Sequence, residues 1–264
     1  MLGKLIKYDF KANAKLMLIL NLAIVIAGFF GGRFIIPNMD KVDSRIIGIV
    51  VIFYILLIVA VGFAVPFIIV SYYYRSFFTE RGYLSFTLPV SKGQHLLSKS
   101  ISGVVWLIVS GLAIIVSLWL LCSTEMANAG LTWKMIGKNL NYIAEEVEMS
   151  SPVMISVMFI LIVLSAIVTC GSLYFSATLG QMARTHKIIA GVGSYFVYNF
   201  ISSTISQVGI VFLVRSNINN IYQGVKTSQV FQQVLWLTFM IQIAAVIVMY
   251  LISWYVLNKK VNLQ

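Results

Sequence analysis

IIGIVVIFYILLIVAVGFAVPFIIVSY, residues 46–72, contains no Asp, Glu, Lys, Arg or His. A helix needs about 20 apolar residues to cross the hydrocarbon layer of a bilayer, and it must bond its own backbone because lipid offers no partners. This stretch exceeds that length, so we expect a transmembrane helix that is tilted or extends past the bilayer. Pro66 within it favours a kink, because proline removes one backbone hydrogen bond.

Five other stretches of the chain meet the same test. The six predicted spans are residues 16–36, 46–72, 101–122, 153–181, 188–214 and 231–257. The 264-residue chain is 60% hydrophobic and only 10% charged, whereas soluble domains are about one quarter charged. We therefore expect an all-α integral membrane protein with six transmembrane helices, forming a single transmembrane domain over residues 1–264.

Basic residues divide unequally between the two faces of the membrane. With six spans both termini lie on one side, and the positive-inside rule assigns that side to the cytoplasm. Twelve of the 19 basic residues fall there: Lys4, Lys7, Lys11, Lys15, Arg75, Arg81, Lys92, Lys99, Arg184, Lys187, Lys259 and Lys260. Attraction to anionic lipid headgroups explains this excess better than binding to nucleic acid does.

The segment before the first span has a basic stripe. Lysines recur at steps of three and four, which places them on one side of a helix: Lys4, Lys7, Lys11 and Lys15. Apolar residues take much of the opposite side, which Asp9 interrupts. We expect residues 1–15 to form an amphipathic helix on the cytoplasmic surface of the membrane.

A second short helix is predicted in the outer loop, residues 123–152. Apolar residues there stand at helical spacing: Ile136, Leu140, Ile143 and Val147. This helix rests on the outer surface, either as a plain connector or as a cap over an exit path.

Sites for catalysis or metal binding are not recognisable in the sequence. The last four predicted spans lack charged residues as well, whereas ion relays and catalytic groups in membranes rely on them. We interpret His95 and His186 as solvated residues of different loops, and Cys122 and Cys170 as inert small hydrophobes. No phosphate-binding loop is present either. We expect no enzyme activity and no cofactor on this chain.

Uncharged polar residues and small residues occur within the spans instead. Four amide side chains line a pathway or tie helices together: Asn21, Asn199, Gln207 and Gln242. Small residues that permit close helix contacts include Gly28, Gly32 and the run 190–194.

Residues 73–100 form the longest predicted cytoplasmic loop, and it has internal order. Its centre reads TERGYLSFTLPVSKGQ, residues 79–94. Gly82 breaks the preceding helix, Pro89 ends a short apolar run, and Ser91 is placed to cap a helix that continues through Leu96 and Leu97. We expect a bent helical elbow parallel to the membrane.

This loop resembles the permease subunits of bacterial type-2 ATP-binding-cassette exporters. The matching residues are Phe77, Phe78, Glu80, Gly82, Tyr83, Leu84, Thr87, Leu88, Pro89, Val90, Ser91, Leu96, Leu97 and Lys99. The six spans and the basic N-terminal helix extend the resemblance over nearly the whole chain. Arg81 departs from the pattern, since an acidic or neutral residue is expected there.

The resemblance implies a coupling helix between the second and third spans, which docks on a separate ATPase subunit. The implied contact residues are Phe77, Phe78, Glu80, Arg81, Gly82, Tyr83, Leu84, Leu88 and Pro89, with a second contact at Arg184. Apolar side chains would anchor the contact, and Glu80 and Arg81 would form charge pairs.

The resemblance also implies that the chain is one subunit of a larger assembly. Two ATPase copies would hold ATP and Mg, and a second permease copy or a paralogue would complete a transporter in the bacterial cytoplasmic membrane. The cargo would be an amphipathic or hydrophobic peptide, antibiotic or lipid, because the spans carry few charges. The alternatives are an ATP-independent carrier or channel, and a membrane enzyme.

Overall fold

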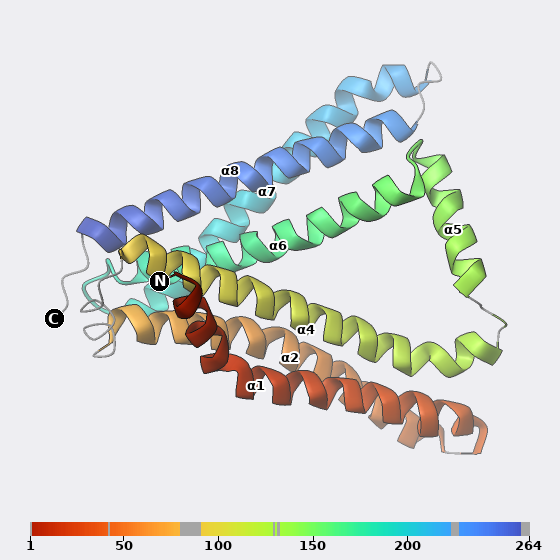
Figure 1. The fold of residues 1–264 in the computed structure, drawn as a ribbon. Coiled ribbons are helices and arrows are strands. Elements are labelled where there is room, and N and C mark those ends of the chain that lie inside the picture. Colours follow the sequence, from red (N-terminus) through yellow and green to blue (C-terminus); the bar gives the residue numbers. More distant parts are fainter. Residues whose placement is uncertain are drawn as a thin grey trace. The chain divides into compact units, whose positions relative to one another are not determined.

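A computed structural model describes residues 2–41, 43–79, 91–128, 130, 133–222 and 227–259. The part of the chain so described is helical and has no strand (Figure 1). Its elements are α1 Leu2–Phe30, the π-helix η1 Gly31–Ile35, the 3-10 helix η2 Ile36–Lys41, α2 Ser44–Phe78, α4 Lys92–Asn128, α5 Trp133–Glu146, α6 Ser151–Gly180, α7 Lys187–Tyr222 and α8 Thr227–Lys259.

Six of these helices are long and apolar enough to cross a membrane, which confirms the predicted number of spans. They are α1 with its extension, α2, α4, α6, α7 and α8. Most of them run past the predicted windows, because those windows end at polar or charged residues. Lys, Arg and Glu are good helix formers, so they end an apolar run without ending the helix. The chain is therefore a multi-pass membrane protein.

The predicted connection between the second and third spans differs in the structure. The loop predicted over residues 73–100 is much shorter, since α2 continues to Phe78 and α4 begins at Lys92. Ser91 does cap α4, as predicted, because its hydroxyl accepts a hydrogen bond from the Gln94 N–H at 3.3 Å. The prediction for His95 was wrong: it lies inside α4 and is 2% exposed.

The separate N-terminal interfacial helix is not confirmed. Residues 2–15 belong to α1, which is one helix from Leu2 to Phe30, although its first turns bend away from the rest (Figure 1). The four lysines of the predicted stripe are exposed, and Asp9 on the opposite side is buried. The short outer helix is confirmed as α5, and its position on a membrane surface stays a prediction.

The chain divides into two compact units. The first contains Met1–Tyr73 and Leu97–Ile136, and the second contains Tyr74–Leu96 and Gly137–Gln264. The prediction of one transmembrane domain over the whole chain stays a prediction.

In the first unit, α1 and α4 run side by side in the same direction. The Phe10 ring stacks on Trp106 at 4.5 Å between centroids, the Ser117 hydroxyl donates to the Ile24 carbonyl at 2.6 Å, and the Thr124 hydroxyl donates to the Gly32 carbonyl at 2.7 Å. The residue numbers of these contacts increase along both helices in the same order, so the two helices are parallel.

Glycines bring these two helices into close contact, as the sequence predicted. A Cβ atom at Gly28 would collide with the backbone of Ser117, and one at Gly32 would collide with the carbonyl of Leu120. Helix α2 packs antiparallel to both through a stripe of large side chains: Tyr54, Val61, Val65, Ile69 and Tyr73. Pro66 lies inside α2 without ending it.

In the second unit, α6 packs against α7 and α8, and α7 packs against α8. A Cβ atom at Gly180 would lie 2.7 Å from the Cα of Gly191, so the glycines again permit close contact. The first turn of α4 belongs here, because the Lys92 ammonium donates to the carbonyl of Leu257 at 3.0 Å.

Candidate functional site: a buried ion pair in the first unit

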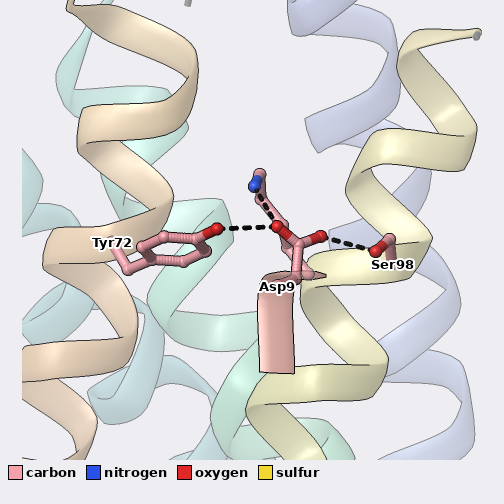
Figure 2. Close-up of polar contacts among 4 residues, drawn as sticks. Asp9, Tyr72 and Ser98 are labelled. Carbon is pink, nitrogen blue, oxygen red and sulfur yellow. Dashed lines mark hydrogen bonds and ion pairs between the residues drawn. The ribbon is translucent and has the colours of Figure 1, made fainter. Parts of the chain in front are cut away.

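Asp9 of α1 and Lys99 of α4 form a buried ion pair (Figure 2). The Lys99 Nζ lies 2.9 Å from the Asp9 Oδ1, and both side chains are 5% exposed. The two residues are 90 positions apart in the sequence. The parallel packing of α1 on α4 brings them together, because each stands on the buried stripe of its helix.

Two further side chains bond to the same carboxylate. The Tyr72 hydroxyl donates to Asp9 Oδ1 at 2.8 Å, and the Ser98 hydroxyl donates to Asp9 Oδ2 at 2.5 Å (Figure 2). The Lys99 ammonium also lies 4.6 Å from the centroid of the Tyr72 ring, a distance typical of a cation–π contact. We call Asp9, Tyr72, Ser98 and Lys99 the aspartate cluster.

Burial makes this cluster energetically sensitive. Isolated charges are costly in a low-dielectric interior, so a buried carboxylate needs an opposite charge and donors for its oxygens. Both oxygens of Asp9 have such donors. A carboxylate held in this way is suited to fixing helices in place, and loss of one partner would leave the other charge unpaired.

The aspartate cluster lies near the ends of the two helices that lead into residues 80–90. Tyr72 stands six residues before the end of α2 at Phe78, and Lys99 stands seven residues after the start of α4 at Lys92. Asp9 therefore bonds the N-terminal part of α1 to the last turns of α2 and to the first turns of α4.

Most of the predicted ATPase-contact residues lie outside the described residues: Glu80, Arg81, Gly82, Tyr83, Leu84, Leu88 and Pro89. Phe77 and Phe78 form the end of α2, where Phe77 is 1% exposed and Phe78 is half-buried. Arg184 is exposed between α6 and α7. In this structure the burial of Phe77 makes it a core residue of the chain.

The four predicted pathway residues are divided between the two units, and their role in a pathway stays a prediction. Asn21 is buried in the first unit. In the second unit Gln207 is exposed, Gln242 is half-buried, and the exposed Asn199 donates to the Tyr195 carbonyl at 2.8 Å.

Sequence reasoning missed the aspartate cluster. It treated Asp9 as an interruption of an apolar side, and counted Lys99 among the cytoplasmic cations. The available signal was an acidic residue in step with Asn13, Met17 and Asn21, all of which share the buried stripe of α1.

No group of three or more His, Cys, Asp or Glu side chains gathers among the described residues. Comparisons of the chain with protein-family models, with curated proteins and with solved structures find no significant match.

Proposed function

We propose that the chain is the transmembrane permease subunit of an ATP-binding-cassette transporter, which exports an amphipathic or hydrophobic cargo using ATP hydrolysed on a separate subunit. The observation that carries this proposal is the segment of residues 79–94, whose sequence resembles the coupling segment of type-2 exporters. The six apolar helices provide the membrane part that such a subunit requires.

The way this segment is attached supports a coupling role. Residues 74–96 belong to the second unit, whereas α2 and α4 both continue without a break into the first. A displacement of the segment would therefore act on both units. The aspartate cluster holds together the two helices that flank the segment, because it bonds both α2 and α4 to α1.

The proposed assembly contains two ATPase subunits, which hold ATP and Mg, and a second copy of this chain or a paralogue. Both termini and the coupling segment lie in the cytoplasm of a bacterial cell. Because Phe77 is buried, the apolar anchor for the ATPase is assigned to residues beyond α2, with Phe78 at its edge.

A double substitution in the segment tests this role. Glu80→Ala with Arg81→Ala removes the proposed charge pairs, so ATPase activity stimulated by cargo should fall, while insertion into the membrane stays unchanged. Lys138→Ala with Glu145→Ala is the matched control, because both residues are exposed on α5. Equal coupling in the two double variants would count against docking at this segment.

The alternative function is an ATP-independent carrier or channel. The aspartate cluster is the observation that favours it, since buried ionisable residues in membrane helices are typical of ion-coupled carriers. Transport by the purified chain alone, driven by an ion gradient in vesicles, would establish this alternative and exclude the first proposal.

A further inference from the structure

Two polar side chains on the facing stripes of α1 and α4 have no hydrogen-bond partner among the described residues. Asn21 is 6% exposed and Ser110 is 3% exposed. Within the described part of the chain, neither the amide nitrogen nor the amide oxygen of Asn21 has a partner, and the hydroxyl of Ser110 has none either. A buried polar group without a partner loses its hydrogen bonds to water and gains none in return, so this arrangement requires an explanation.

Ser110 differs from several serines in the membrane helices that bond within their own helix. A serine in a helix usually donates to a carbonyl of its own preceding turn. Ser165 and Ser203 do this where they are exposed, and Ser176 does it although it is buried. Burial therefore does not prevent such a bond, and the unpaired Ser110 hydroxyl is available to another group.

The position of these residues is fixed by contacts on either side. The stacking of Phe10 on Trp106 lies before them along both helices, and the contact of Gly28 with the backbone of Ser117 lies seven residues after each of them. Between these contacts Asn21 belongs to the buried stripe of α1, and Ser110 follows Trp106 by one turn on α4. Both residues belong to the first unit.

We propose that Asn21 and Ser110 bind a water molecule between α1 and α4. The free groups are an amide that both donates and accepts and a hydroxyl that does the same, which matches water, a ligand that needs two to four polar partners. The neighbouring buried residues Met17, Ile24 and Trp106 carry no charge, so the site is suited to an uncharged ligand. This proposal is independent of the proposed function.

Water-edited solid-state NMR on the full-length protein in lipid bilayers tests the proposal directly. Magnetisation from water should reach the Cβ of Asn21 several-fold faster than the Cβ of Met17 or Ile24. Those two residues are 0% exposed and share the same stripe, which makes them matched controls. Transfer to Asn21 as slow as to Met17 and Ile24 would overturn the proposal.

A second measurement tests whether Ser110 shares the water. Ser110→Ala should slow the transfer to Asn21 several-fold, because the water loses one of its partners. Ser165→Ala is the control, since the Ser165 hydroxyl is exposed and bonds within α6. If Ser110→Ala leaves the transfer to Asn21 at its original rate, the shared site is refuted.

Discussion

Asp9 pairs across helices although four lysines surround it in its own helix. Those lysines are exposed, whereas Asp9 lies on the buried side of α1 and reaches Lys99 of α4. The ion pair therefore neutralises a buried charge, and the four exposed lysines take no part in it. At the scale of single residues, the aspartate cluster is therefore sensitive to loss of either charge.

Removing one charge of the pair should strongly destabilise the protein. Asp9→Asn or Lys99→Met leaves the other charge buried without its counter-ion, which costs about 3–5 kcal/mol. The double variant Asp9→Leu with Lys99→Met should recover much of this loss, since no charge then remains buried. Chemical unfolding in detergent, followed by intrinsic fluorescence, measures the free energy of unfolding.

Lys138→Met is the control for this series, because Lys138 is exposed on α5 and should change stability little. Single variants as stable as that control would show that Asp9 and Lys99 are not paired in a dry environment.

The aspartate cluster also shows a limit of sequence reasoning. The charge of Asp9 and its place on an apolar helix side were visible, but its partner is 90 positions away. Spacing within one helix cannot identify a partner on another, so neither Lys99 nor Tyr72 could be assigned to it.

At the scale of elements, the contact between α1 and α4 depends on glycine. The sequence predicted that Gly28 and Gly32 permit a close helix contact, and the structure confirms it and identifies the backbone at Ser117 and Leu120 as the neighbouring surface. The neighbour could not be predicted, because small residues are frequent in membrane helices and do not specify a partner.

A large side chain at Gly28 should separate these helices. Gly28→Leu places new atoms against the backbone of Ser117, which cannot move aside as a flexible side chain can. We expect a loss of about 1–3 kcal/mol or more in the free energy of unfolding. Gly62→Leu on α2 is the matched control, because nothing lies within 4 Å of a Cβ atom there. Equal stability of the two variants would contradict the observed packing of α1 on α4.

Element boundaries were predicted less well than element number. All six apolar runs lie within helices of the structure. However, α2 and α4 both extend into residues 73–100, which were predicted as a loop. Hydropathy detects the part of a helix that suits lipid, and it does not detect where the backbone bonding ends.

At the scale of the whole molecule, an even number of helices long and apolar enough to cross a membrane predicts that both termini lie on one side. The excess of basic residues predicts that this side is the cytoplasm. A fluorescent protein fused after residue 264 should therefore fluoresce, and alkaline phosphatase fused there should be inactive. Insertion of the same reporters at Gly130 should give the reverse result. Active phosphatase at the C-terminus would invert the topology and remove the coupling segment from the cytoplasm.

The proposed function depends more on the resemblance of one segment than on the fold. Six apolar helices suit many classes of membrane protein, and residues 80–90, which carry most of the resemblance, lie outside the described residues. The structure adds the bonds of the flanking helices: α2 and α4 are both bonded to α1 at the aspartate cluster, and the first turn of α4 is bonded to Leu257 within the second unit.

Site-specific photo-crosslinking in living cells tests the central claim most directly, namely that a separate ATPase drives this chain through residues 79–94. A photoreactive amino acid replaces Tyr83 in the segment, or Tyr142 on α5, which is 68% exposed, as the control. The account predicts that position 83 crosslinks to a polypeptide carrying a nucleotide-binding loop and that position 142 does not. The absence of such an adduct at position 83, or equal adducts at both positions, would contradict it.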